Sequence, residues 1–90
     1  MIYTYEPTAS IHKLAAAYIY GIVKNHPFSD GKKRLAFLCA ENFLWLNGWR
    51  ITSSQVDIVS FLVSVASGNA NEDQVADWLA QNSEPKLLKE

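Results

Sequence analysis

The sequence has few of the residues that build disulfide-rich, fibrous or membrane-spanning proteins. Its 90 residues include one cysteine, three prolines and four glycines. An intramolecular disulfide framework is therefore excluded, and a reducing compartment is expected. No apolar run reaches the roughly 18 residues of a membrane span, and the N-terminus lacks the basic start and apolar core of a signal peptide. These absences predict a cytoplasmic protein that does not insert into a membrane.

The sequence also has no large excess of charge of either sign. The formal net charge is -1, which argues against a nucleic-acid-binding role for the chain as a whole. Hydrophobic residues make up 49% of the chain and aromatic residues 12%, a composition typical of a globular core rather than of disorder. We expect a single domain over residues 1–83 and a frayed tail over 84–90. Cys39 lies in an apolar run and is expected to be buried.

Apolar residues with the helical period predict a first helix over residues 11–25, with Thr8 or Ser10 as its N-cap. A second helix is predicted from residue 31 to about 46. It is apolar nearly all round, so we expect it at the centre of the fold.

Two further helices follow. The stretch from Thr52 to Gln55 has the pattern of a capping box and opens a predicted helix over 53–67. Asn71 and Gln74 repeat that pattern before a short fourth helix. The residues expected to face inward from the third helix are Val56, Val59, Leu62, Val63 and Ala66, and those from the fourth are Val75, Trp78 and Leu79. The sequence thus predicts an all-α bundle.

The stretch between the first two helices carries the chemistry. His26 can act as a general base near neutral pH, and Asp30 is an oxygen ligand suited to Mg²⁺ beside phosphate. Gly31 lies at the start of the next helix, whose unpaired N–H groups form an anion site. Phe28 is expected to anchor the loop to the core.

Three cations, Lys32, Lys33 and Arg34, fall in the first turn of the second helix, where they oppose the helix dipole. Their presence there implies a compensating anion, and a phosphate chain is the natural candidate. Residues 26–34 together predict phosphoryl or nucleotidyl transfer. Each feature taken alone has a plainer explanation: a capping histidine, an Asp-Gly turn and solvated surface cations.

Two motifs carry a family resemblance. HPFSDGKKR (26–34) resembles the Fic/Doc signature His-Pro-Phe-x-Asp/Glu-Gly-Asn-x-Arg, and FLWLNG (43–48) resembles the Phe-Leu-x-x-Asn-Gly ending found in the Doc branch. The resemblance implies a small all-α Fic/Doc bundle. It also implies a Doc-like toxin that transfers phosphate from ATP to a hydroxyl of elongation factor Tu, arrests translation and is restrained by a Phd-like antitoxin. Two alternatives stay open: a Fic-type nucleotidyltransferase, or an inactive remnant that only binds a partner.

The resemblance also implies roles by position. His26 would deprotonate the target hydroxyl, and Asp30 would bind Mg²⁺. The residues expected at the nucleotide are Gly31, Lys32, Lys33 and Arg34.

The chain departs from the family in two respects. Lys32 stands where the motif has asparagine, and a misplaced phosphate would lower the rate. Doc proteins also carry further residues before this region, including a first helix and a flap, so the chain resembles an N-terminally short member. We therefore expect reduced or absent activity and an uncovered apolar surface that binds a partner or a second copy.

Overall fold

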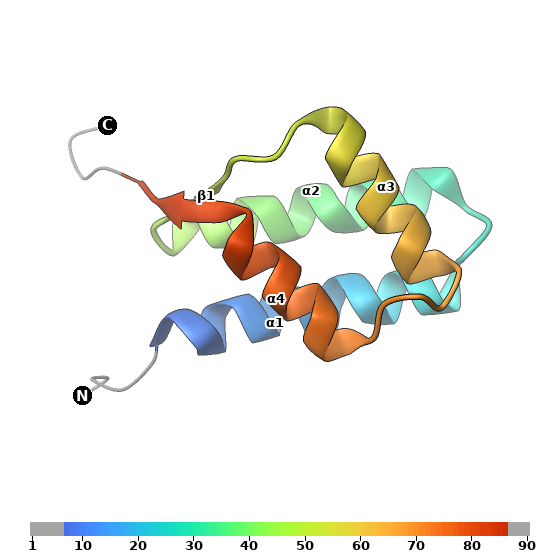
Figure 1. The fold of residues 1–90 in the computed structure, drawn as a ribbon, viewed down its shortest axis with the longest axis horizontal. Coiled ribbons are helices and arrows are strands. Elements are labelled where there is room, and N and C mark those ends of the chain that lie inside the picture. The colour runs from blue at the N-terminus through green and yellow to red at the C-terminus, as the bar shows by residue number, and fades with distance from the viewer. Residues whose placement is uncertain (1–6, 87–90) are drawn as a thin grey trace.

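The computed structural model describes residues 7–86. Over this range the chain forms four helices and two short strands: α1 (Pro7–Asn25), α2 (Asp30–Leu46), β1 (Trp49–Ile51), α3 (Gln55–Ala66), α4 (Glu72–Gln81) and β2 (Ser83–Pro85). Helices α1 and α2 lie side by side, and α3 and α4 cross one face of that pair (Figure 1). The predicted all-α class is confirmed. None of the described helices combines the length and the apolar character needed to cross a bilayer.

Helix α1 is the centre of the bundle, because it contacts each of the other three helices. Its buried face includes Ala15, Ala16, Ile19 and Val23, all at most 2% exposed. Alanines on this face let neighbouring helices approach closely. The prediction that the second helix is central is wrong: α2 buries only one face, and its Leu35 and Leu38 are each 58% exposed.

The helix ends depend on local capping. Helix α1 begins at Pro7, a residue suited to the first helical position, so positions 8 and 10 lie inside the helix and not at the predicted N-cap position. The predicted capping box of α4 is confirmed. The Asn71 side chain accepts from the Gln74 N–H and the Gln74 side chain accepts from the Asn71 N–H, each at 2.8 Å.

Helix α3 differs from its prediction in both its cap and its buried face. Its N-cap is Ser54, whose Oγ accepts from the Asp57 N–H at 3.2 Å, so the predicted box over 52–55 is wrong. Three of the five residues expected to face inward are instead exposed, and a fourth, Ala66, is only partly buried. The exposed three are Val56 (74%), Val59 (45%) and Val63 (54%).

Aromatic packing explains the rotation of α3. The Phe61 ring stacks on Trp78 of α4 with centroids 4.0 Å apart, and it meets Phe37 of α2 edge-on at 6.5 Å. Aromatic side chains contribute more buried area than valines, so this cluster turns Phe61, Ile58 and Leu62 toward the core.

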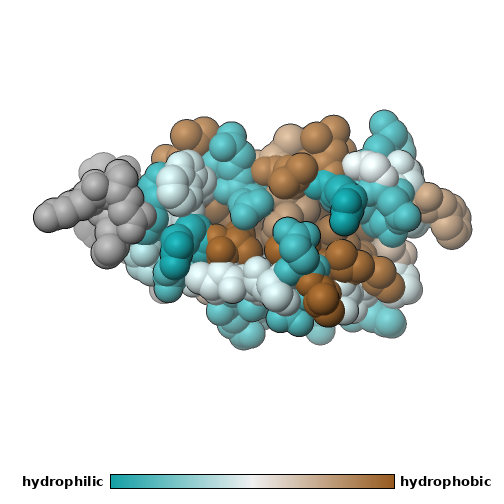
Figure 2. Space-filling model, turned by 90° about the horizontal axis from the view of Figure 1, so that it is seen from above, coloured by the Kyte–Doolittle hydropathy of each residue, from teal (hydrophilic) through white to brown (hydrophobic). Residues whose placement is uncertain are grey.

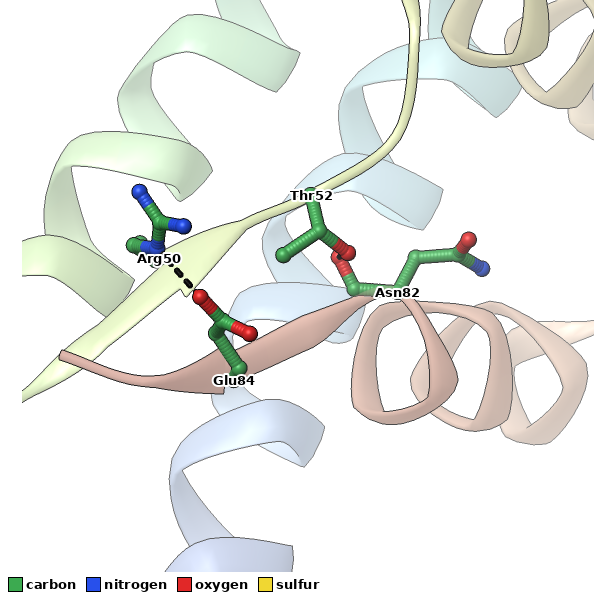
Figure 3. A network of polar contacts seen from close by, with 4 residues as sticks. All are labelled: Arg50, Thr52, Asn82 and Glu84. Atoms are coloured by element: carbon green, nitrogen blue, oxygen red, sulfur yellow. Dashed lines mark hydrogen bonds and ion pairs between the residues drawn. The ribbon is translucent and has the colours of Figure 1, made fainter.

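The two strands pair as an antiparallel ribbon, which joins the segment after α2 to the segment after α4 (Figure 3). Arg50 Nε donates to Glu84 Oε2 at 2.6 Å, and Thr52 donates to the Asn82 carbonyl through both its N–H and its hydroxyl. Residues 84 and 85 therefore belong to β2, and the Lys86 N–H donates to the Gly48 carbonyl. The predicted frayed tail does not begin at residue 84. Residues 87–90 lie outside the described part of the chain.

A buried histidine holds this ribbon against α1. His12 is 1% exposed; its Nε2 lies 2.9 Å from Ser83 Oγ, and its ring meets the Trp49 ring edge-on with centroids 4.8 Å apart. No role was predicted for His12. Its position one residue after Ile11, on an otherwise apolar face, was the available signal.

Candidate active site

The loop between α1 and α2 is a tight turn fixed by backbone hydrogen bonds. The His26 N–H donates to the Ile22 and Val23 carbonyls at 3.0 and 3.3 Å, which closes the end of α1. The His26 carbonyl in turn accepts from the Ser29 N–H at 3.1 Å. These bonds hold the backbone of His26 against Ser29, the residue directly before α2, and the His26 side chain is exposed to solvent.

The N-terminus of α2 leaves two backbone donors open. Ser29 is the N-cap: its Oγ accepts from the Lys32 N–H at 3.2 Å and its carbonyl accepts from the Lys33 N–H at 3.1 Å. The N–H groups of Asp30 and Gly31 have no acceptor among residues 7–86. Two adjacent free donors at the positive end of a helix form an anion-binding site.

Gly31 keeps the space above these donors clear. A Cβ built at Gly31 would meet nothing within 4 Å, and its backbone is not in the left-handed region. Packing and backbone conformation therefore place no demand for glycine at this position. Close approach of a ligand to the backbone is the remaining physical reason for a glycine here.

The charged side chains of this turn divide into two groups. Lys33 Nζ lies 3.2 Å from Asp30 Oδ1; the Lys33 side chain is 13% exposed and that of Asp30 is 91% exposed. Arg34 forms no ion pair with any described residue. These three residues line a groove between α2 and α3. His26, Gly31 and Lys32 do not line it and are exposed beside it.

Phe28 does not anchor the loop, and that prediction is wrong. Phe28 is 97% exposed. The loop is instead held by its backbone hydrogen bonds, with Pro27 partly buried. Cys39 also differs from its prediction, since it is exposed and lies beside Tyr18 in a second groove between α1 and α2. The pKa of the Tyr18 phenol is raised, first by its hydrogen bond with the Cys39 side chain and second by the charge of Cys39.

The residues present fit Mg²⁺ only as a partner of bound phosphate. No group of three or more histidine, cysteine, aspartate or glutamate side chains gathers to hold a metal within the described range. Asp30 offers one exposed carboxylate beside the open helix start. Mg²⁺ usually binds through one or two carboxylates together with water and substrate phosphates, which is the arrangement that Asp30 permits.

The comparisons with known proteins bear on this same region. A family model described as Fic/DOC family matches residues 2–44, which include the loop and most of α2. The chain is also 31% identical over 75 residues to "Protein kinase doc" of Escherichia phage P1. The chain is therefore similar to the Fic/Doc family, and within that family to the Doc branch. The aligned region is 83% of this chain and 59% of the phage protein, so the chain spans about three fifths of that relative. No solved structure matches it.

The Fic/Doc motif explains one side of the groove, but the α3 side was not expected. Ile58, Val59 and Leu62 line it opposite Arg34 and Leu38. Val59 was predicted to face the core, and no residue of α3 was predicted in the site. The available signal was the excess of valines around α3, more than one buried face requires.

Proposed function

We propose that this protein is a Doc-like toxin kinase, which transfers the γ-phosphate of ATP to a hydroxyl of a protein target. The observation that carries the proposal is the open start of α2. The N–H groups of Asp30 and Gly31 have no acceptor among residues 7–86, and Asp30, Lys33 and Arg34 line the groove that begins there. The name of the phage relative as a protein kinase supports the choice of phosphate as the transferred group.

In this proposal His26 removes the proton of the target hydroxyl. The hydroxyl oxygen then bonds to the γ-phosphorus, the bond from that phosphorus to the β–γ bridging oxygen breaks, and ADP leaves. The free N–H groups, Lys33 and Arg34 bind the phosphate oxygens, and Gly31 leaves room for them. Asp30 would hold Mg²⁺, which neutralises phosphate charge when it is bound. The target expected from the family is elongation factor Tu, with arrest of translation in the cytoplasm as the result.

Lys32 occupies a separate position in this scheme. Its backbone N–H already donates to Ser29 Oγ, so residue 32 can contribute to phosphate binding only through its side chain. An asparagine there can both donate and accept, whereas lysine only donates. We propose that Lys32 lowers the transfer rate without removing the anion site.

Transfer can be tested with ATP labelled on either the γ- or the α-phosphate, with purified elongation factor Tu as the acceptor. We expect γ-label on the acceptor, and loss of the general base in His26→Ala should lower its rate by about 10²- to 10⁴-fold. Lys32→Asn should raise it. Appearance of the α-label instead would make the protein a nucleotidyltransferase, the second activity in this family.

A binding-only remnant predicts a different result. Neither label would reach the acceptor, even with Lys32→Asn, although ATP would still bind. Circular dichroism of each variant controls for folding. In cells, expression of the wild-type chain should slow growth and His26→Ala should relieve the effect. Equal growth of the two would count against the toxin proposal.

We also propose a protein partner, an antitoxin of the Phd kind. Leu14, Leu35, Leu38 and Leu46 are each 58–72% exposed, and exposed apolar side chains that gather in a patch mark interaction sites. A second copy of the chain is the other occupant that this surface admits. Sedimentation of the purified chain alone and with its candidate antitoxin separates the two: self-association would appear in the first sample, and a mixed complex only in the second.

A further inference from the structure

A groove of about 540 Å³ runs between α2 and α3 and starts at the proposed phosphate site. Its floor is made by buried apolar residues and its walls by exposed ones. The floor residues are Phe37, Ile58 and Leu62, and the wall residues are Leu38, Val59 and Val63. Seen from above in Figure 2, apolar side chains gather among polar ones over the middle and right of the molecule.

The groove also has polar side chains. Asp30, Lys33 and Arg34 lie at one end, at the start of α2. Helix α3 begins above α2 and runs toward that start (Figure 1). Glu41, two turns further along α2, and Gln55, the first residue of α3, also line the groove and supply its other polar side chains. Arg34 and Glu41 are two helical turns apart, about 10 Å along the axis, a length that suits the ribose and base attached to a bound phosphate.

Glu41 is a candidate ligand-binding residue. It is partly buried in the groove, yet among residues 7–86 it makes no ion pair and no side-chain hydrogen bond. An ionised carboxylate only accepts hydrogen bonds, so its complement is a donor such as an amino group. The apolar walls suit the flat faces of a base between them.

From this arrangement we infer that the α2–α3 groove holds the nucleoside end of the nucleotide, with the amino-bearing edge of an adenine base against Glu41. The inference rests on the proposed function, because it takes the phosphates to lie at the start of α2. Gln55 also lines the groove, where its amide can donate to a ring nitrogen of the base. Glu41 is then a specificity residue for the nucleotide.

Two ligands that differ by one amino group provide the test. ATP and purine riboside triphosphate are the same except for the 6-amino group of ATP, and inorganic tripolyphosphate carries only the phosphate chain. Calorimetric titration of the whole chain should give ATP about ten- to a hundredfold tighter binding than purine riboside triphosphate, the value of one hydrogen bond to a charged group.

Variants assign that difference to Glu41. Glu41→Ala should remove it and leave tripolyphosphate binding unchanged; alanine is a good helix former, so α2 should persist. Glu41→Gln should keep part of the difference, because its amide oxygen still accepts. The matched control is Asp77→Ala, which removes an equal charge from an exposed position in α4 outside the groove.

The inference is overturned if wild-type protein binds ATP and purine riboside triphosphate equally, or if Glu41→Ala leaves their ratio unchanged. Equal binding of ATP and tripolyphosphate would show that the nucleoside lies outside the groove. The occupant of the groove would then be an apolar protein segment. None of these binding results affects the proposed function, provided that γ-label still reaches the acceptor. Failure of that transfer, with the ATP preference intact, would overturn the kinase proposal alone. The wild-type comparison needs no variant and so does not depend on how Glu41→Ala folds.

Discussion

Gly31→Ala should stabilise the fold and weaken nucleotide binding at the same time. Gly31 is the second residue of α2, and a Cβ there would meet nothing within 4 Å. The substitution therefore adds helix propensity without a clash. We expect it to stabilise the fold by about 0.5 kcal/mol, the low end of the range for replacing glycine with alanine in a helix. For a domain of this size that corresponds to a rise in Tm of about 2–4 °C.

The same substitution adds a methyl group next to the free N–H groups of Asp30 and Gly31, where we expect it to hinder the approach of a phosphate. A phosphate held away from one of them loses a charge-assisted hydrogen bond, about 1.5–3 kcal/mol, or about ten- to a hundredfold in Kd. Thermal unfolding followed by circular dichroism measures the first effect, and titration with ATP and with tripolyphosphate measures the second. Both ligands should weaken alike, because both bind through phosphate.

Gly21→Ala is the matched control. Gly21 is also helical, in α1, and also has open space where a Cβ would lie, but it is not part of the loop or of the start of α2. It should raise Tm by a similar amount and leave binding unchanged. The reasoning is refuted if Gly31→Ala lowers Tm, which would mean that the fold requires glycine, or if it raises Tm and binding stays at the wild-type level.

Three stability predictions follow from burial and capping, each measured by thermal or urea unfolding. Phe28→Ala should cost less than about 0.5 kcal/mol because the residue is 97% exposed, whereas Phe37→Ala should cost about 3–5 kcal/mol; equal losses would show that the loop is anchored after all. Asn71→Ala should cost about 1 kcal/mol through loss of the α4 capping box, and an unchanged midpoint would contradict this. Arg50→Ala removes the exposed pair with Glu84 and should cost about 0.2–1 kcal/mol, less in high salt; a cost independent of salt would indicate lost packing.

Local signals in the sequence were enough to place most of the helices. The Asn71–Gln74 box and the helical period of α1 correspond to the observed elements, since capping and periodicity are properties of neighbouring residues. The period did not fix the buried face of α1, because the apolar Leu14 and Tyr18 are exposed.

The start of α2 was predicted at residue 31, one residue after the observed Asp30, although Ser29 was not identified as its N-cap. The family motif then placed Asp30 and Arg34 beside one another.

Features that depend on distant residues were not predictable in this way. The rotation of α3 depends on Phe61 stacking with Trp78, and nothing within α3 alone favours that face over the valines. The ribbon required Arg50 to meet Glu84, 34 positions later. Phe28 looked like an anchor because an apolar residue in a polar loop is usually buried; its exposure is a consequence of the tight turn at His26.

Charge at the start of α2 connects stability to the proposed site. Asp30 favours the positive end of the helix dipole, and it neutralises Lys33 at 3.2 Å. Lys32 and Arg34 have no such partner among the described residues, so both oppose the dipole without compensation. A bound phosphate chain would supply the missing negative charge. Because only one of the two cations lines the groove, Arg34 is placed to bind phosphate, whereas Lys32 adds repulsion at the helix start and long-range attraction for the anion. That difference is why Lys32→Asn should affect the transfer rate more than it affects phosphate affinity.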